Sequence, residues 1–235
     1  MKTIVVTGAT SGIGAAAVRA LAADGARVFL IGRSASRLAA LARALPRGRL
    51  AGTALADLCT LSDLRRLLAQ VSAQLPRVDV LLHCAGEHGF TRPGRPDTGQ
   101  FDHMFAVNVR APYVLTQGLL PRLKRARGQV IFVNSSVVRG RGAGVAAYKA
   151  TRQALQGLTD GLRHDLNRHG VRVTSLFPGR TATPAMRRIC AQERRPYRPD
   201  LFMSARDVAG VLLVLTQLPA RVEVTDLHLR SPRPY

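Results

Sequence analysis

The stretch Thr7-Gly8-Ala9-Thr10-Ser11-Gly12-Ile13-Gly14 decides how the chain begins to fold. It follows the apolar, β-branched run Thr3–Thr7 and leads into Ala15-Ala16-Ala17, which places it between a strand and a helix. Three glycines at this spacing allow a sharp turn, a close approach of the backbone to phosphate, and tight packing of helix on strand. Backbone N–H groups at the start of the helix can then bind the pyrophosphate of a dinucleotide.

Apolar runs typical of buried strands alternate with helical stretches along the whole chain. We therefore expect an α/β, three-layer Rossmann fold, in which a mainly parallel seven-stranded sheet carries helices on both faces. The expected strands are Thr3–Thr7, Arg27–Ile31, Leu50–Leu55, Val78–Cys84, Gln129–Asn134, Val171–Phe177 and Val222–Leu229. Apolar residues three and four positions apart predict helices that include Ala15–Ala23, Leu38–Leu45 and Leu61–Leu75.

Two stretches interrupt this alternation within a chain whose 235 residues fit a single domain, 1–235. Glu87–Gly99 is rich in glycine and proline, and we expect a loop there. Arg180–Ser204 mixes prolines with arginines and predicts a partly helical flap at about residues 180–205. Because both stretches follow strand ends, where ligands bind in α/β sheets, both could border a substrate pocket.

The chain is strongly basic, with a net charge of +21, and only three of its 35 basic residues are lysines. One explanation is a basic surface for nucleic acid, an anionic membrane or an acidic partner. The other is the codon bias of a GC-rich genome, which favours arginine together with alanine, glycine and proline. That bias does not fully explain why acidic residues number only 14. Aromatic residues make up 5% of the chain and no recognition motif is present, which argues against nucleic-acid binding.

Targeting and cysteine signals favour a cytoplasmic protein that contains no metal. No apolar run is long enough to cross a bilayer, so no membrane association is expected. Met1-Lys2-Thr3 leads at once into an expected strand, leaving no room for a signal peptide. Cys59, Cys84 and Cys190 form no C-x-x-C pair, so we expect free thiols and neither a zinc site nor a disulfide framework.

Arg33 follows the second expected strand, at the position where an acidic residue would bond the ribose 2′-hydroxyl of NAD. No acid is present there, and the planar fork of arginine can pair with a 2′-phosphate instead. The residue therefore favours NADP over NAD. In so arginine-rich a chain, an arginine placed by chance is the alternative.

Tyr148 and Arg152 lie four residues apart at the start of an amphipathic helix, so they share one helix face. A cation beside a phenol lowers its pKa from about 10, which makes Tyr148 a candidate acid/base. Lowering that pKa to about 7 needs roughly 4 kcal/mol, on the order of what one cation about 4 Å away supplies at an effective dielectric of about 20. Just upstream, Asn134-Ser135-Ser136 can place a hydroxyl in the same crevice.

With further motifs in the same order, these residues resemble the short-chain dehydrogenase/reductase family over essentially the whole chain. The resemblance implies an NADP(H)-dependent oxidoreductase that transfers a hydride between nicotinamide and a small-molecule carbonyl or alcohol substrate. The motifs are Thr7-Gly8-x-x-x-Gly12-x-Gly14, Asp57, His83-Cys84-Ala85-Gly86, Asn108-Val109, Ser135, Tyr148 and Pro178-Gly179-Arg180-Thr181-Ala182-Thr183.

The resemblance also implies a role for each catalytic position. Tyr148 is similar to the residue that gives a proton to the carbonyl oxygen, and Ser135 to the residue that positions this oxygen, with Ser136 as the alternative. Asn108 is similar to the asparagine that holds a water in the proton relay. Arg152 stands where the family has its lysine, which tunes the tyrosine and bonds the nicotinamide ribose.

The implied cofactor contacts are spread along the chain. Asp57 is similar to the residue that contacts adenine, and Thr183 to the one that contacts the nicotinamide-side phosphate. The full cofactor set is Gly8, Thr10, Ser11, Gly12, Ile13, Gly14, Arg33, Asp57, Leu58, Ala85, Gly86, Tyr148, Arg152, Pro178, Gly179, Thr181 and Thr183.

Two positions depart from the family pattern. Arg152 keeps the positive charge of the lysine but is bulkier and cannot release a proton. The relay could be slower, or the protein could be a redox-silent NADP-binding protein of the same fold. Lys149 points off the face of Tyr148, so it should not substitute. Cys84 stands for an asparagine and removes polar contacts that brace the central strand, for which we expect a structural cost and no loss of activity.

Substrate and assembly are less determined. The flap contains Arg180, Arg187, Arg188, Arg194, Arg195 and Arg198. These arginines could favour an anionic or phosphopantetheine-tethered substrate, or they could be solvated residues that reflect biased composition. Family members usually pair through two helices, here about Gln100–Arg125 and Ala147–Arg168, which implies a homodimer or homotetramer.

Overall fold

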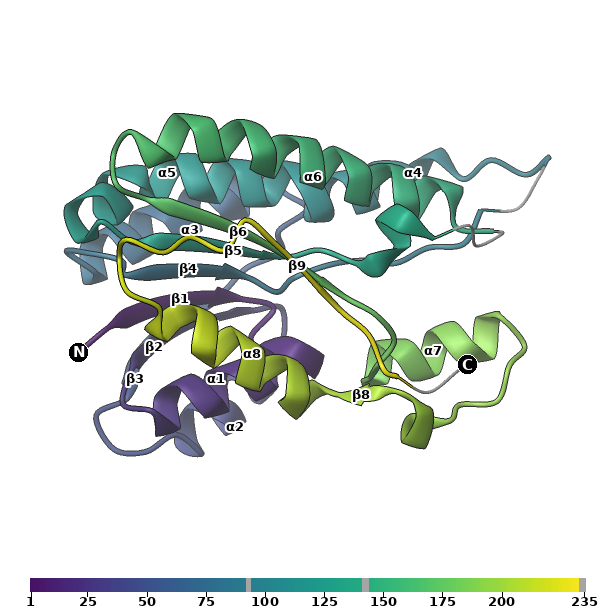
Figure 1. The fold of residues 1–235 in the computed structure, drawn as a ribbon, viewed down its shortest axis with the longest axis horizontal. Helices are drawn as coiled ribbons and strands as arrows, with labels where there is room; N and C mark the ends of the chain where they lie inside the picture. Colours follow the sequence, from purple (N-terminus) through teal and green to yellow (C-terminus); the bar gives the residue numbers. More distant parts are fainter. Residues whose placement is uncertain (92–93, 141–143, 233–235) are drawn as a thin grey trace.

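A computed structural model describes residues 1–91, 94–140 and 144–232. Seven strands form one parallel sheet in the order β3-β2-β1-β4-β5-β6-β9, which confirms the expected fold class (Figure 1). The strands are β1 Thr3–Thr7, β2 Arg27–Gly32, β3 Leu50–Leu55, β4 Val80–His83, β5 Gln129–Val133, β6 Arg172–Pro178 and β9 Asp226–Leu229.

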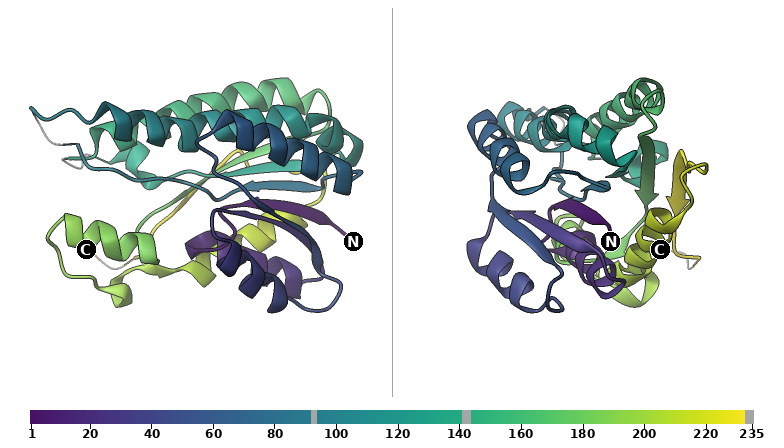
Figure 2. Two further views of the ribbon diagram at one scale, coloured as in Figure 1. Left: turned by 180° about the vertical axis from the view of Figure 1, so that it is seen from behind. Right: turned by 90° about the vertical axis from the view of Figure 1, so that its left-hand side faces the viewer.

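Helices cover both faces of the sheet. On one face lie α1 (Gly12–Ala23), α2 (Ala35–Arg43) and α8 (Ala205–Gln217), and on the other α3 (Leu61–Gln74), α5 (Ala111–Ala126) and α6 (Ala146–Asn167) (Figures 1 and 2). Successive residues of β1 alternate between two cores: Val5 packs with the side of α3, α5 and α6, and Ile4 and Val6 pack with the side of α1 and α8. Burial on both faces explains why the strands are apolar throughout.

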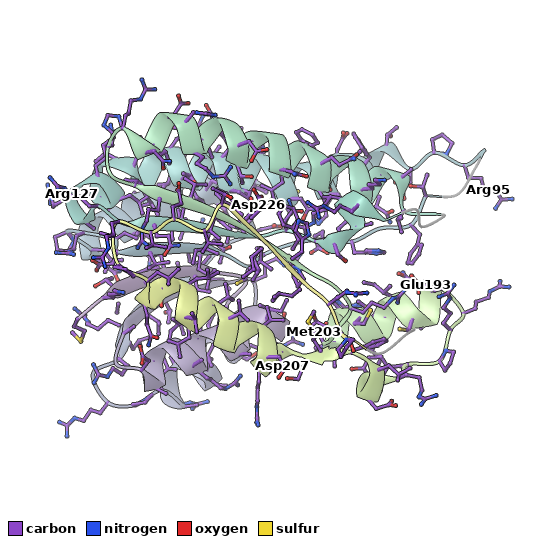
Figure 3. All side chains as sticks on the ribbon, in the orientation of Figure 1. Arg95, Arg127, Glu193, Met203, Asp207 and Asp226 are labelled. Carbon is purple, nitrogen blue, oxygen red and sulfur yellow. The ribbon has the colours of Figure 1, made fainter. Side chains whose placement is uncertain are left out.

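The flap and the neighbouring loop lie beyond the carboxyl ends of the strands, where Figure 1 shows α4 and α7 on the same side of the molecule. The flap contains β7 (Thr181–Ala182), α7 (Pro184–Gln192), a 3-10 turn (Pro199–Leu201) and β8 (Met203–Ser204), so its partly helical character is confirmed. Met203 and Asp207 mark the passage from β8 into α8 (Figure 3). The expected loop at Glu87–Gly99 ends at Asp97, which caps α4 (Thr98–Phe105) by accepting from the N–H of Gln100 at 2.8 Å. Residues 92 and 93 of that loop lie outside the described part of the chain.

Two expected strands are shorter than their apolar runs. The fourth is Val80–His83 instead of Val78–Cys84, and the last starts at Asp226 instead of Val222. Val222 forms a turn with Pro219, and the carboxylate of Glu223 accepts a 2.6 Å hydrogen bond from the N–H of Val173. A side chain therefore takes the place of a strand partner at this edge of the sheet, which ends the ladder early.

The order of the strands reverses at β1, which lies between β2 and β4. Thr7 is the register partner of His83, and the N–H of Cys84 donates to the carbonyl of Thr7 at 3.2 Å. The glycine turn after β1 therefore faces Ala85 and Gly86 after β4. This point, where neighbouring connections diverge, is where ligands bind in open α/β sheets.

Two further features concern residues 1–91, 94–140 and 144–232. Within them, no helix has the length and apolar character that a membrane crossing requires. The same residues contain no group of three or more histidine, cysteine or acidic side chains arranged to hold a metal ion. All three cysteines are free thiols.

Candidate active site

The glycine turn has the geometry that its sequence predicts. Gly8 and Gly12 adopt φ values of +64° and +52°, a left-handed conformation that favours glycine. A Cβ on Gly8 would lie 2.7 Å from the backbone nitrogen of Ala85, and one on Gly14 would overlap the carbonyl oxygen of Gly8. The side chain of Ser11, the N-cap of α1, forms no capping hydrogen bond in the described structure. The first N–H groups of α1 are therefore open to an anion.

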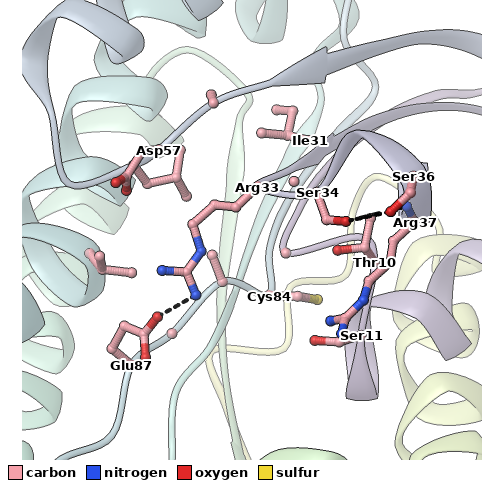
Figure 4. A pocket seen from close by; sticks show the side chains of 17 residues that line it. Thr10, Ser11, Ile31, Arg33, Ser34, Ser36, Arg37, Asp57, Cys84 and Glu87 are labelled. Atoms are coloured by element: carbon pink, nitrogen blue, oxygen red, sulfur yellow. Dashed lines mark hydrogen bonds and ion pairs between the residues drawn. The ribbon is translucent and has the colours of Figure 1, made fainter. Parts of the chain in front are cut away.

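A hollow of about 530 Å³ lies over the carboxyl ends of β1, β2 and β4 (Figure 4). The predicted cofactor residues that it brings together are Gly8, Thr10, Ser11, Arg33, Asp57, Leu58, Ala85 and Gly86. Gly12 and Gly14 shape the turn from within. The hollow is also lined by Ser34 and Arg37, which sequence reasoning missed. Ser34 is the N-cap and Arg37 lies in the first turn of the helix that follows Arg33, and this closeness to Arg33 is the signal that could have identified them.

Arg33 reaches across this hollow to Glu87, which sequence reasoning also missed (Figure 4). The guanidinium of Arg33 and the carboxylate of Glu87 are 2.7 Å apart, and the Arg33 side chain is 59% exposed. His103 Nε2 lies 3.9 Å from the same carboxylate. Arg33 is thus held over the hollow by an acidic group, which an anionic ligand of Arg33 would have to displace.

A second hollow, of about 270 Å³, continues the first, because Cys84, Gly86 and Glu87 line both. The predicted site residues that it brings together are Ile13, Gly86, Ser135, Tyr148, Arg152, Pro178, Gly179, Thr181 and Thr183. Residues from β5, α6, β6 and the flap therefore surround one space. The crevice runs from the glycine turn to Tyr148.

Tyr148 and Arg152 lie on the first turns of α6 and contact each other. Arg152 Cζ is 5.2 Å from the centroid of the Tyr148 ring. Arg152 is only 5% exposed, and its guanidinium donates to the carbonyl of Val133 at 3.4 Å and packs against Gly86. Its Nε is buried without a hydrogen-bond partner among the described residues. Lys149, in contrast, donates to the carbonyl of Gly140 at 2.8 Å, away from this pair.

The two candidate serines occupy different environments. Ser135 is half-buried and lines the hollow with Tyr148. Its hydroxyl caps the 3-10 turn Ser136–Arg139 by accepting from the N–H of Val137 at 3.2 Å. Ser136 is exposed and does not line the hollow as described.

Asn108 lies behind the crevice in a π-helical turn, Ala106–Arg110, between α4 and α5. Its side chain accepts from the N–H of Glu87 at 2.8 Å and donates to the carbonyl of Glu87 at 2.9 Å and the hydroxyl of Thr151 at 3.0 Å. The amide thus fixes the start of the loop after β4. Because these contacts occupy the side chain, a water in a relay would have to bind the main chain of this turn. Such π-turns are frequent at functional sites.

The departure at His83 and Cys84 is accommodated by burial. His83 Nε2 lies 3.0 Å from the hydroxyl of Thr116, and its ring stacks on Phe132 with centroids 4.9 Å apart. Burial lowers the pKa of His83 to about 3 and raises that of the Cys84 thiol to about 12, so both are neutral at pH 7. The central strand is therefore braced by packing and one hydrogen bond.

The flap closes the crevice against the glycine turn. The hydroxyl of Thr183 caps α7 by accepting from the N–H of Met186 at 3.1 Å, and a Cβ on Gly12 would lie 3.3 Å from Thr183 Cγ2. Arg180 binds both carboxylate oxygens of Glu193, at 3.0 and 2.8 Å, near the end of α7 (Figure 3). Thr183 is therefore next to the turn that would hold a pyrophosphate.

Comparisons with known proteins agree with this geometry. The family profile of short chain dehydrogenases matches residues 2–194. An oxidoreductase of Staphylococcus epidermidis is 30% identical over 97% of this chain and 96% of its own length. Bovine L-fucose dehydrogenase is 32% identical over 83% of this chain and 72% of its own.

A solved structure shares the whole fold. An alcohol dehydrogenase of the archaeon Thermococcus sibiricus, complexed with 5-hydroxy-NADP, superposes with a TM-score of 0.88, 28% identity, and coverage of 100% of this chain and 99% of its own. A metagenomic short-chain oxidoreductase in complex with NADP gives a TM-score of 0.81 at 28% identity, over 97% and 96% of the two chains. The chain belongs to the short-chain dehydrogenase family of oxidoreductases.

Proposed function

We propose that the chain is an NADP(H)-dependent reductase or dehydrogenase that acts on a C=O or CH–OH group, with Tyr148 as general acid/base. One observation carries the proposal: a single crevice joins the glycine turn and Arg33 at one end to Ser135, Tyr148 and Arg152 at the other. That arrangement suits a dinucleotide lying with its nicotinamide end toward the tyrosine.

The residues present fit such a cofactor. The open N–H groups of α1 suit a pyrophosphate, and the buried, partnerless Nε of Arg152 among the described residues suits a ribose hydroxyl. When bound, the nicotinamide would supply or accept the hydride. Arg33, with Ser34 and Arg37 beside it and no acid at the end of β2, favours the form that carries a 2′-phosphate.

The chain's own residues would manage the proton and the reacting oxygen. In the reducing direction, the Tyr148 hydroxyl donates its proton to the carbonyl oxygen of the substrate, and the Ser135 hydroxyl holds that oxygen by a hydrogen bond. The guanidinium of Arg152 keeps a positive charge over the ring that becomes negative when the proton leaves. Since Arg152 cannot release a proton, Tyr148 is reprotonated by water, held in our proposal by the main chain near Asn108.

A redox-silent NADP-binding protein is the second candidate, because the Arg152 guanidinium fills space against both Tyr148 and Gly86. The test is NADPH oxidation across a panel of carbonyl compounds, together with a direct NADPH titration. Turnover supports the enzyme. The redox-silent alternative would be established if the wild type binds NADPH without turnover, and if Arg152→Lys turns over while the neighbouring exchange Lys149→Arg does not.

We further propose that residues 1–235 act as one cofactor-binding unit and that the chain pairs through α4, α5 and α6 into a homodimer or homotetramer. Phe101, Phe105 and Tyr113 on α4 and α5 are 39%, 42% and 46% exposed. Exposed apolar side chains that are grouped on one surface are typical of a protein–protein interface. Light scattering should then show an oligomer that Phe105→Glu converts to a monomer. A wild-type monomer at all concentrations would refute the pairing.

A further inference from the structure

The flap arginines differ in whether they have a side-chain partner and in whether they line the second hollow. Three of the flap arginines already have a side-chain partner. Arg180 pairs with Glu193, Arg198 pairs with Asp200 at 3.0 Å, and Arg187 lies over the Tyr197 ring at 5.1 Å. Arg188 lies on α7, lines the second hollow, and has no ion pair or hydrogen bond with a described residue. Of the flap arginines that the sequence offers for binding an anionic substrate, Arg188 is therefore the one placed to do so in this hollow.

The acidic groups nearby do not cancel this charge. Glu87, which lines the hollow, is paired with Arg33, and Glu193, at the end of α7, is paired with Arg180. The lining also includes the Arg152 guanidinium, so its unpaired charges are positive. A positively charged substrate group would meet repulsion here, whereas an anionic one would meet attraction.

His88 also lines the same hollow and has a polar atom without a partner among the described residues. Its ring lies 4.5 Å from the Tyr148 ring and 4.8 Å from the Phe90 ring, measured between centroids, which fixes its orientation. Its Nδ1 is buried with no hydrogen-bond partner among the described residues. Burial, with smaller contributions from Arg152 and Arg180, lowers the pKa of His88 to about 4 against an opposing effect of Glu193. A neutral imidazole that lacks a partner next to Tyr148 is suited to a hydrogen bond with a bound substrate: Nδ1–H donates to a carbonyl oxygen, and Nδ1 without the hydrogen accepts from a hydroxyl.

We propose that the substrate of this enzyme is a short oxo acid or hydroxy acid whose carboxylate binds Arg188, while His88 Nδ1 bonds the polar end that faces Tyr148. The hollow of about 270 Å³, which in our proposal also receives the nicotinamide end of the cofactor, is of a size that suits a small substrate. The fork of arginine matches the two oxygens of a carboxylate. This inference rests on the proposed hydride-transfer function.

The test compares levulinate with methyl levulinate, which differ in charge and share one ketone. We expect kcat/KM with NADPH to be about ten- to a hundredfold higher for the acid, the value of one charge-assisted contact. Arg188→Met should remove this preference through KM for the acid and leave the ester unchanged. Arg187→Met is the matched control, because Arg187 lies over Tyr197 and does not line the hollow as described. It should preserve the preference.

An ester reduced as well as the acid, or a preference that survives in Arg188→Met, would overturn the inference and leave the proposed function standing. Failure of every carbonyl compound to turn over would count against the proposed function alone. In that case calorimetry with the protein–NADP⁺ complex decides: glutarate should bind, its dimethyl ester should not, and Arg188→Met should abolish the difference. Glutarate binding that is absent, or equal in both proteins, would refute the anion site.

Discussion

Replacing Arg33 with methionine should weaken NADPH binding and leave NADH binding nearly unchanged. Arg33 lines the adenosine end of the crevice, and only the 2′-phosphate distinguishes the two cofactors there. Methionine keeps the aliphatic stem and removes the charge. The change therefore separates packing from recognition of the phosphate.

The magnitude follows from the two contacts that Arg33 can make. A hydrogen bond to a charged group is worth about 1.5–3 kcal/mol, and the high exposure of Arg33 places this one toward the lower end. The ion pair with Glu87, which NADP would break, is itself exposed and worth about 0–1 kcal/mol. The difference is about 0.5–2 kcal/mol, so Kd for NADPH should rise by about two- to thirtyfold.

Fluorescence or calorimetric titration at fixed salt measures both affinities, because an exposed phosphate contact is screened by ions. Glu87→Gln should act in the opposite direction and tighten NADPH binding by up to about fivefold, since it removes the competing carboxylate. Arg168→Met, which breaks an exposed pair with Asp165 at the far end of α6, is the control. Unchanged NADPH affinity in Arg33→Met, or an equal loss for NADH, would refute the assignment of Arg33 to the 2′-phosphate.

Three further changes test the fold and the site. Gly14→Ala should lower the free energy of unfolding in urea by about 1–3 kcal/mol, because its Cβ would overlap the Gly8 carbonyl. Gly157→Ala, whose Cβ would meet nothing within 4 Å, should be neutral or stabilising. Equal effects of the two changes would contradict the close packing. His83, with its pKa lowered from 6.5 to about 3, binds a proton more readily when unfolded, so its contribution of about 5 kcal/mol is present above pH 6.5 and is lost as the pH falls toward 3. Unfolding of His83→Phe should depend less on pH across that window, and an unchanged slope would show that His83 is not the source. Arg152→Lys should place an ammonium where the sequence resemblance predicts a lysine and raise kcat at least severalfold with little change in NADPH affinity; an unchanged or lower kcat would show that the arginine is no obstacle.

The sheet was predictable because its five central strands, β2, β1, β4, β5 and β6, are almost entirely buried and mainly apolar. The glycine turn and the helix face shared by Tyr148 and Arg152 depend on local spacing, so they too followed from the sequence. The true start of the last strand could not be predicted, because the carboxylate of Glu223 accepts the hydrogen bond from the N–H of Val173 on β6 that a strand carbonyl would otherwise accept. The pattern of apolar residues does not reveal where a side chain replaces the backbone as a hydrogen-bond partner.

The contacts that distinguish this site depend on which strands are neighbours. Arg33 meets Glu87 because β2 and β4 flank β1, and no local pattern announces a pair so far apart in sequence. Arg188 likewise differs from the other flap arginines in lining the second hollow, which depends on how the flap folds over the sheet. His88 stands in a loop with no motif, and only its ring contact with Tyr148 connects it to the site.

The central claim, that Tyr148 transfers a proton in an NADP(H)-dependent reaction, is tested most directly by comparing NADPH oxidation by the wild type and Tyr148→Phe. The best substrate of the carbonyl panel should be turned over by the wild type and at least about a hundredfold more slowly by Tyr148→Phe, with NADPH binding retained. Equal rates in the two proteins, or no turnover by either the wild type or Arg152→Lys, would contradict it.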